Sequence, residues 1–390
     1  FFFFFFFFFF FFFFFFFFFF FFFFFFLMMR NHKSIYILHR RPKTRPSSYI
    51  SAVLAILIFL SQKVPQPIFA LRPTTSASRI RNLLSEFDRT SLNPDRRAIA
   101  IPGVHDALSA KIFSECGASA LFLSGFGVSA SRLGAPDAGV LTLSEMEDVA
   151  RGVVSAASPT PVIADGDTGH GGPSNIRRCV RGLAAAGCAG VTIEDQKFPK
   201  RCTFAAGGGV KVVSREMALK RVKAAIAARE EAREIDGNDI IVVARTDCRA
   251  AMGYSEVVER CLLFEDAGAD VVYAESLKDR NEYVDLRSRL GDSTAMMIAQ
   301  LQVQGTEGDS YEECQVLYDA QEVGKMGYAL ALYGVTALQA VISTLQGTAH
   351  EFVLGAGIIH TDSKLTLSSF DNVKKTVGFP ELYNFEENYN

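Results

Sequence analysis

Residues 161–196 read PVIADGDTGHGGPSNIRRCVRGLAAAGCAGVTIEDQ and contain a complete strand–helix–strand unit. Two short apolar runs, PVIAD at 161–165 and GVTIE at 190–194, flank the amphipathic stretch Ser174–Ala186, which predicts a helix. The Ala-Gly pair that follows this helix is typical of a C-cap leading into the next strand. Because both runs are almost continuously apolar, we expect strands buried on both faces, as in a parallel sheet.

The same pattern continues on both sides of this unit, and a second helix is predicted at Ser214–Ala232. Eight β/α repeats predict a closed (β/α)8 barrel of the TIM type, in the α/β class. A doubly wound open sheet is the alternative, but no GxGxxG fingerprint follows the first strand. The expected strands are Ala98–Pro102, Ala120–Ser124, Pro161–Asp165, Gly190–Glu194, Ile240–Arg245, Val271–Glu275, Ala295–Gln300 and Ala329–Tyr333.

The chain begins with an unbroken phenylalanine run, Phe1 to Phe26. We interpret it as a sequence artefact or translated repeat, with Met28 or Met29 as the start of the protein. A membrane helix is the alternative interpretation, since roughly 20 apolar residues can span a bilayer.

Residues 30–81 have the composition of a targeting segment, with ten Lys or Arg and no Asp or Glu. The apolar stretch Ala52–Leu60 suits a signal-peptide core, and Phe69 leads into a basic stretch rich in Ser and Thr. This layout resembles the bipartite presequences of algae with complex plastids, so it predicts a signal plus transit peptide and a plastid location. A mitochondrial presequence is the alternative.

Charge and cysteine usage narrow the classes of function. The chain has 40 basic and 42 acidic residues, and removing residues 30–81 leaves 30 basic against 42 acidic. An acidic remainder argues against a nucleic-acid partner, and we expect no stable membrane association after the presequence is removed. The seven scattered cysteines, with no CxxC pair, indicate reduced thiols. We expect a largely disordered presequence at 1–89, a catalytic barrel at 90–346 and a C-terminal helical tail at 347–390.

In such barrels the active site forms at the C-terminal ends of the strands. Here these ends carry carboxylates, an arginine and several neutral polar groups, which is more acid than a solvated rim requires. In chain order they are Ser124-Gly125, Asp165-Gly166-Asp167, Glu194-Asp195-Gln196, Arg245-Thr246-Asp247, Glu275-Ser276, Gln300 and Tyr333.

Asp165, Asp167 and Glu194 together predict a metal site. Hard carboxylate oxygens suit Mg2+, with Mn2+ as the alternative, and water would complete the octahedron. Without a cation, three carboxylates on one rim would repel one another. The competing interpretation is that Asp165 or Asp167 caps a turn.

Three further positions suggest how a substrate would be held. The planar fork of Arg245 suits a substrate carboxylate, although a salt bridge to Asp247 or Glu275 is the alternative. Ser124 and Gly125 could donate a hydroxyl and a backbone N–H group to another carboxylate or to an enolate oxygen.

The segment Lys200-Arg201-Cys202 precedes the glycine-rich stretch 203–209, which predicts a lid that excludes water from a carbanion. Two neighbouring cations should lower the pKa of the Cys202 thiol, which could then exchange a proton with an enolate carbon. An ordinary surface cysteine is the alternative.

Together these segments resemble the isocitrate lyase/phosphoenolpyruvate mutase superfamily, and in particular its plant carboxyvinyl-carboxyphosphonate phosphorylmutase-like and petal-death-type members. The resemblance runs from about Pro102 to the C-terminus and is densest through residue 290. It implies a barrel, Mg2+ and an enolpyruvate-like intermediate. The motifs that carry it are PGVHDALSAKI, FLSGFGVSASRLGAPDAG, VIADGDTGHGG, VTIEDQKFPKRC, VVSREMALKRVKAA and VARTDCRA.

The resemblance assigns roles by position. Asp165, Asp167 and Glu194 match the residues that hold the metal, directly or through water, and Asp137 matches a site aspartate. The segment Ser124-Gly125-Phe126 matches a substrate-binding stretch, and Arg245 matches a carboxylate ligand. Cys202, with Lys200, matches the lid motif of the lyase branch, in which the cysteine is the general acid. This favours C–C cleavage. The family's last barrel helix often swaps between subunits, which implies a homodimer or homotetramer.

Several positions depart from the family pattern, mainly after strand six, where Glu275 still matches. Thr203-Phe204 replaces Gly-His, and Gln300 replaces an expected Asn. Thr336 and Gln339 stand where a Ser and an Arg are usual. We expect Glu275, Gln300 and Thr336 to contact the substrate, whose identity is left open.

The predicted function is that of a Mg2+-dependent lyase or C–C hydrolase acting through an enolate on a small 2-oxo or 2-hydroxy di- or tricarboxylate. A phosphonomutase acting on phosphoenolpyruvate or its carboxyphosphono analogue is one alternative. A metabolite-binding pseudoenzyme is the other.

Overall fold

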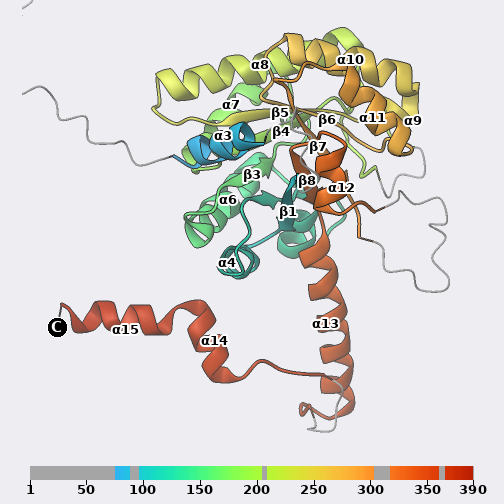
Figure 1. Cartoon of the computed structure of the whole chain (residues 1–390). Helices are drawn as coiled ribbons and strands as arrows, with labels where there is room; N and C mark the ends of the chain where they lie inside the picture. The colour runs from blue at the N-terminus through green and yellow to red at the C-terminus, as the bar shows by residue number, and fades with distance from the viewer. Residues whose placement is uncertain (1–74, 88–95, 204–208, 303–316, 360–364, 390) are drawn as a thin grey trace, which may run out of the picture. The chain divides into compact units, whose positions relative to one another are not determined.

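The computed structural model describes residues 75–87, 96–203, 209–302, 317–359 and 365–389. Their strands form a closed parallel barrel in which each strand pairs with its neighbours in chain order, and β8 pairs with β1 (Figure 1). All eight expected strands are present, so the predicted (β/α)8 barrel is confirmed. The strands are β1 Ile99–Val104, β2 Leu121–Leu123, β3 Val162–Asp165, β4 Gly190–Glu194, β5 Ile241–Thr246, β6 Val271–Ala274, β7 Ala295–Gln300 and β8 Leu330–Tyr333.

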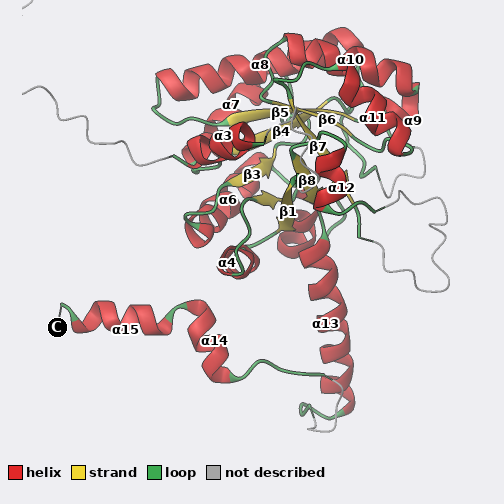
Figure 2. Cartoon of the chain, in the orientation of Figure 1, coloured by secondary structure: helices red, strands yellow, loops and turns green. Residues whose placement is uncertain are grey.

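Helices surround the strands, as Figure 2 shows. The two helices predicted from periodicity, α7 and α8, begin and end within two residues of the expected positions. The helices are α3 Ser76–Glu86, α4 Ala107–Glu115, α5 Gly125–Val128, the π-helix η1 Ser129–Leu133, α6 Leu143–Ala157, α7 Pro173–Ala185, α8 Arg215–Glu234, α9 Cys248–Met252, α10 Tyr254–Asp266, α11 Arg280–Arg289, α12 Ala320–Lys325, α13 Thr336–Leu354, α14 Phe370–Val377 and α15 Phe379–Glu387.

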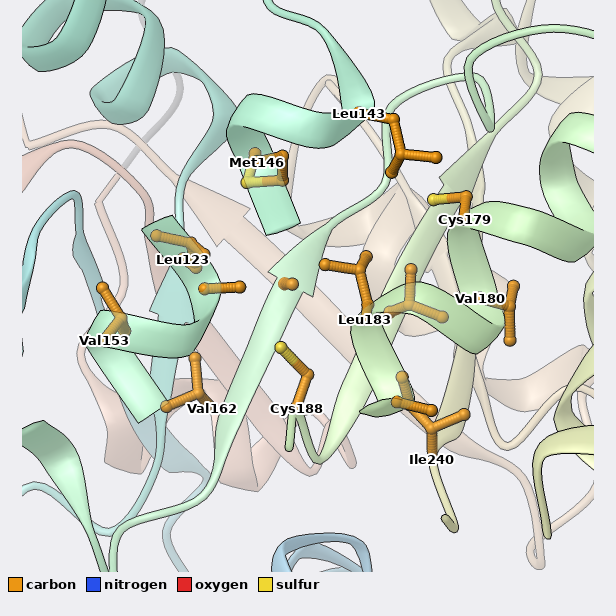
Figure 3. Packing of buried hydrophobic residues seen from close by; sticks show 14 of the residues in the cluster. Leu123, Leu143, Met146, Val153, Val162, Cys179, Val180, Leu183, Cys188 and Ile240 are labelled. Carbon is orange, nitrogen blue, oxygen red and sulfur yellow. The ribbon is translucent and has the colours of Figure 1, made fainter. Parts of the chain in front are cut away.

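The apolar faces of α6 and α7 fix the position of the strands that end at the acidic residues. Figure 3 shows Met146 of α6 and Leu183 of α7 pointing toward the β3 region, with Val162 and Cys188 between the two helices. All four side chains are at most 1% exposed. Full burial of each apolar side chain stabilises the fold by about 1.5–3 kcal/mol. This core therefore holds the ends of β3 and β4 rigidly.

Strand register brings the polar strand ends together. Asp165 of β3 lies beside Thr192 of β4, and Glu194 of β4 lies beside Arg245 of β5. Parallel strands present their carboxyl ends at one face of a barrel. The acids of β3 and β4 and the guanidinium of β5 therefore share one mouth.

The folded part of the chain begins earlier than expected. Helix α3 lies within the range 1–89 assigned to the presequence, yet its Ile80 is fully buried in one apolar cluster with Ile101 and Val243 of the barrel. Arg81 pairs with Asp239 and Asp270 of the barrel. The domain boundary expected near residue 90 is therefore too late. The phenylalanine run and the Ala52–Leu60 core lie outside the described residues.

The C-terminal boundary also differs from the expected one. Helix α13 continues through residues 346 and 347 and ends at Leu354. Helices α14 and α15 follow, and neither has a buried residue. None of the described helices is both long enough and apolar enough to cross a membrane.

Candidate active site

Asp165 is held by the backbone around it. Its Oδ1 accepts from the Asp167 N–H group at 3.1 Å, and its Oδ2 accepts from the Gly125 N–H group at 3.3 Å. A Cβ atom at Gly125 would lie 2.9 Å from Asp165 Oδ2, so glycine is required for this close approach. Asp167 adopts a left-handed backbone (φ 50°), a conformation that non-glycine residues rarely take outside tight turns and functional sites. The ends of β2 and β3 are thus locked together.

Glu194 is one of several deeply buried acids of the mouth. Its Oε2 lies 3.4 Å from Arg245 Nε, whereas its Oε1 is buried and has no hydrogen-bond partner in the described part of the chain. Burial raises its pKa well above the ordinary value, and Asp247 adds to this, although Arg245 opposes it. Arg221 Nη1 fixes the backbone by donating to the Glu194 carbonyl at 3.1 Å. A buried, unpaired carboxylate oxygen is costly unless it binds a cation or a proton.

Lys200 reaches into the acidic group from the segment after β4. Its Nζ lies 2.8 Å from Asp137 Oδ1 and contacts Asp167 Oδ1, and its side chain is 5% exposed. Burial by itself would lower the pKa of Lys200, but Asp167, Asp165 and Glu194 outweigh it and hold the pKa well above the ordinary value. The ammonium group is therefore charged and serves as a counter-ion inside the site.

The donor set fits a divalent metal by its chemistry. In the described residues no three His, Cys, Asp or Glu side chains are already gathered as a metal cluster. The Lys200 ammonium lies against Asp167 instead. However, the predicted ligands Asp165, Asp167 and Glu194 offer buried carboxylate oxygens only, and one of these oxygens is unpaired. Hard oxygens of this kind suit Mg2+ or Mn2+. For Asp167 to bind the metal through Oδ1, the contact between this oxygen and the Lys200 ammonium group must break.

Arg245 already pairs with acids through Nε and Nη2. Its Nη2 lies 2.7 Å from Asp247 Oδ1 and 3.1 Å from Glu275 Oε2, and its guanidinium stands 5.1 Å from the centre of the Tyr273 ring. This is the salt bridge that the sequence offered as an alternative. Carboxylate binding by Arg245 stays a prediction, and a substrate carboxylate would share the guanidinium with these acids.

The remaining predicted residues follow β2 and β4 along the chain. Ser124 Oγ accepts from the Gly127 N–H group at 3.2 Å, and within the described residues its own hydroxyl proton has no acceptor. The Gly125 N–H group is used by Asp165, and Phe126 is half-buried. Cys202 is half-buried two residues beyond Lys200. Phe204 lies outside the described residues.

The ends of β7 and β8 carry neutral polar groups that bind backbone. Gln300 donates from Nε2 to the Tyr318 carbonyl at 2.8 Å and accepts from the Tyr318 N–H group at 2.6 Å. Tyr333 also donates to that carbonyl at 2.9 Å, and Gln339 donates to the Gln302 carbonyl at 2.8 Å. Thr336 Oγ1 is buried and has no partner among the described residues. In this structure Gln300 therefore clamps a loop rather than facing the mouth with a free amide.

Two supporting interactions were not foreseen from the sequence. Asp195 accepts from Thr246 Oγ1 at 2.6 Å and from Arg260 Nη1 at 2.8 Å, and Arg260 is fully buried. Gln196 brackets Arg201, which means that its side-chain amide bonds both backbone groups of that residue: Oε1 accepts from the Arg201 N–H group at 2.9 Å, and Nε2 donates to the Arg201 carbonyl at 3.0 Å. Gln300 binds the backbone of Tyr318 in the same way. A signal for Arg260 existed, because this charged residue stands among Val257, Cys261 and Phe264 on an apolar helix face.

Comparisons with known proteins agree with this geometry. The family described as phosphoenolpyruvate phosphomutase matches residues 89–353. The 2,3-dimethylmalate lyase of Eubacterium barkeri is 32% identical over 319 residues, covering 80% of this chain and 98% of the lyase. The chloroplastic carboxyvinyl-carboxyphosphonate phosphorylmutase of Arabidopsis thaliana is 38% identical over 252 residues, covering 62% and 67%. The structure of oxaloacetate acetylhydrolase with 3,3-difluorooxalacetate superposes with a TM-score of 0.70 at 28% identity, covering 81% and 98%.

Proposed function

We propose that this chain, which belongs to the phosphoenolpyruvate phosphomutase family, is a Mg2+-dependent lyase that cleaves a C–C bond in a small 2-oxo or 2-hydroxy di- or tricarboxylate. Family membership makes the chain an enzyme of the isocitrate lyase/phosphoenolpyruvate mutase superfamily. The observation that carries the proposal is the buried carboxylate group at the ends of β3 and β4, with Glu194 Oε1 unpaired among the described residues and Arg245 beside it.

Asp165, Asp167 and Glu194 would hold the metal, with Mn2+ as a substitute for Mg2+. When bound there, a divalent cation supplies Lewis-acid stabilisation of the negative charge that develops on an enolate oxygen. Gly125 contributes by holding Asp165 through its N–H group. Low exposure of these side chains keeps the local dielectric low, which strengthens each electrostatic contact.

The other mouth residues would bind the substrate and move the proton. Arg245 would bind one substrate carboxylate, and Glu275, which shares the guanidinium, would adjust to the bound ligand. The Ser124 hydroxyl proton, which lacks an acceptor in the described part of the chain, would be donated to a substrate oxygen. Cys202 would deliver a proton to the carbon that carries the negative charge after bond cleavage. Lys200 and Asp137 would set the charge around that carbon.

The substrate class follows from the charge of the site and from the relatives. The names 2,3-dimethylmalate lyase and oxaloacetate acetylhydrolase both refer to small dicarboxylates. The mouth holds buried Lys200 and half-buried Arg245, two cations that could meet two carboxylates once a metal neutralises the acids. Gln300, whose amide binds Tyr318, leaves the β7 side less polar than the β3 side. We therefore expect a substituted malate or a related 2-oxo dicarboxylate.

The test is a substrate panel with the purified enzyme at saturating Mg2+. Isocitrate-like, 2-alkylmalate and oxaloacetate substrates are assayed for release of pyruvate, glyoxylate or oxalate. We expect activity that EDTA abolishes and that Cys202→Ala reduces strongly while Mn2+ still binds. Cys116→Ala, which changes an exposed cysteine, is the matched control and should behave as wild type. Metal-bound enzyme with no turnover on any substrate would instead favour a metabolite-binding pseudoenzyme.

A phosphonomutase is the second candidate, favoured by the family description and by the Arabidopsis relative. The presence of Cys202 in a lyase-like motif counts against it. Phosphorus NMR of reactions with phosphonopyruvate or phosphoenolpyruvate would detect a change between P–C and P–O bonds. A P–C product would reverse the order of the two proposals.

We further propose that the chain forms a homodimer or homotetramer in which C-terminal helices are shared. The side chains of Phe370 and Phe385 are 75% and 63% exposed on α14 and α15, and Val353 is 75% exposed on α13. Large apolar side chains gathered on unburied helices are typical of association surfaces. Light scattering should show an oligomer that dissociates when residues 360–390 are removed.

The plastid location remains a proposal, with a mitochondrial location as its alternative. It is supported by the composition of residues 30–81 and by the chloroplastic relative. Because Ile80 belongs to the barrel core, processing should cut before Thr75. Amino-terminal sequencing of the imported protein, and imaging of a fluorescent protein fused to residues 28–75, would test both points.

A further inference from the structure

The Lys200 side chain joins three loops of the barrel mouth. It extends from the segment after β4 and contacts Asp137, from the loop after β2, and Asp167, from the loop after β3. Its amine is buried with them, and the bracket between Gln196 and the Arg201 backbone fixes the chain next to it. A long, mobile side chain is thus held in one place by two acids and a braced backbone.

The charges around Lys200 do not balance. Asp137, Asp165, Asp167 and Glu194 all act on its ammonium group. Arg245, a half-buried cation of the mouth, is shared among Glu194, Asp247 and Glu275. A buried ion needs a close partner of opposite sign, because its hydration has been lost. The acidic group thus has less positive charge than it needs even with Lys200 in place.

We propose that Lys200 is a tethered counter-ion that a divalent cation displaces from Asp167, so that Lys200 sets the affinity of the site for metal. The inference rests on the proposed function, which supplies the metal. Lys200 contacts Asp167 Oδ1, an oxygen of a predicted ligand, and a lone pair that accepts from an ammonium group is not free for a metal. Asp137, 2.8 Å from Nζ, is the partner that keeps Lys200 after displacement.

Displacement follows from the repulsion between the two cations. An ammonium group and a divalent ion on one carboxylate would lie within a few ångströms, where like charges repel strongly at low dielectric. A metal binding to the wild type must therefore break the contact between Lys200 and Asp167. Removing the ammonium group removes that cost and leaves the acids with a stronger need for a cation. The unusual consequence is that loss of a buried residue of the site should tighten metal binding.

The experiment measures the Kd for Mn2+ by electron paramagnetic resonance and for Mg2+ by calorimetry, at pH 8, where protons compete least with the metal. It uses the full chain as wild type, Lys200→Met, Lys200→Arg and Lys197→Met. Lys197 is exposed on the same segment, so its variant is matched in charge and position. We expect Lys200→Met to bind metal about tenfold more tightly or better, since a broken buried pair costs at least that much. Lys200→Arg and Lys197→Met should stay close to wild type.

A second measurement keeps the proposal falsifiable if Lys200→Met is unstable. The metal-induced rise in Tm should be larger for Lys200→Met than for wild type, because the metal then replaces the missing counter-ion. If the variant unfolds without metal, Mn2+ should restore its fold. Failure to restore it, or equal or weaker metal binding by a folded Lys200→Met, overturns the inference.

Metal binding by an Asp137 variant distinguishes this inference from the proposed function. If Asp137 acts only through Lys200, Asp137→Asn changes the Kd for Mn2+ in the wild type and has no effect in the Lys200→Met background. An equal weakening in both backgrounds would make Asp137 part of the metal site and count against the counter-ion role. Wild type that binds no divalent metal would end the proposed function itself, whereas wild type that binds metal without an effect of Lys200 would end only this inference.

Discussion

The two halves of the barrel mouth use their polar residues in opposite ways. At the ends of β3 and β4, Asp165, Asp167 and Glu194 crowd into a buried acidic group that lacks enough positive charge. At the ends of β7 and β8, Gln300 and Tyr333 are neutral and bind the Tyr318 backbone. The same position in the fold thus gathers acidic charge on one side and supports a loop on the other. Polar character at a strand end does not by itself distinguish these two uses.

The largest effect expected from this comparison is the loss of metal from the acidic half. Asp165→Asn and Glu194→Gln should each weaken Mn2+ binding by at least about a hundredfold, since loss of even an outer-shell partner costs 10–100-fold. Turnover should fall below detection. Electron paramagnetic resonance measures the Kd, and Asp279→Asn, at an exposed helix cap, is the control for an acid-to-amide change. Unchanged Mn2+ binding in Asp165→Asn would show that the acidic half does not bind the metal through Asp165.

Two glutamines with the same local role allow a matched test of the halves. Gln196 brackets Arg201 in the acidic half, and Gln300 brackets Tyr318 in the neutral half, with two hydrogen bonds each. Gln300→Ala should lower the free energy of unfolding by about 2–4 kcal/mol, because buried backbone groups lose their partners. Gln196→Ala should lower it by less, because the Arg201 backbone groups are only partly buried. Only Gln196→Ala should also alter the Kd for Mn2+ and lower kcat, since its loop carries Lys200 and Cys202.

Urea unfolding and Mn2+ titration together measure both effects. If Gln300→Ala changed metal binding as much as Gln196→Ala did, the two halves would be energetically coupled. The distinction between a chemical and a supporting half would then fail.

Two tyrosines give a smaller contrast of the same kind. Tyr333 donates to the Tyr318 carbonyl, which also accepts from Gln300, whereas Tyr273 donates to Glu275 beneath Arg245. Replacing either with Phe should cost about 0.5–1.5 kcal/mol of stability, the usual net value of one hydrogen bond. Tyr273→Phe should also raise KM, because the Glu275 carboxylate that shares Arg245 loses a donor. If KM rose in Tyr333→Phe and not in Tyr273→Phe, the β7 and β8 side of the mouth, and not the Arg245 side, would bind the substrate.

The barrel itself could be predicted because its signal is local. Near-continuous apolar runs such as GVTIE and AMMIAQ form β4 and β7 with the expected bounds, and parallel strands place their carboxyl ends at one mouth. The placement of Asp165, Asp167 and Glu194 at the same mouth follows from that geometry. Their coordination of a metal stays a prediction.

What the sequence could not reveal depends on the reach of single side chains. The Lys200 side chain has to cross two loops to meet Asp137 and Asp167, and no spacing rule fixes that path. The use of both Gln300 amide atoms by Tyr318 likewise joins two residues that are 18 positions apart in the chain, a separation that no local pattern bridges. Helix α3 was hidden by the basic composition around it, although Ile80, Leu83, Leu84 and Phe87 have helical spacing.

The smallest expected effect concerns the support behind the acidic half. Glu256 accepts from Arg260 Nε at 2.8 Å and from Arg215, and Arg260 in turn holds Asp195. The hydrogen bond from Arg215 contributes most to lowering the pKa of Glu256 below its ordinary value, and the bond from Arg260 adds to this.

A carboxyl whose pKa is lower in the folded chain releases its proton more readily there than in the unfolded chain. Its contribution to stability is therefore complete above the unfolded pKa of about 4.5 and is lost as the pH falls through the lower folded pKa.

Glu256→Gln should lower the free energy of unfolding at pH 7 by about 1 kcal/mol, near the upper end for exposed pairs. It should also make the loss of stability below pH 4.5 less steep. Urea unfolding between pH 3 and 7 measures both. Glu259→Gln, which removes a more exposed partner of Arg215, should change neither. An equal effect of the two variants would show that Arg215 alone, and not the buried Arg260 behind Asp195, accounts for the contribution of Glu256.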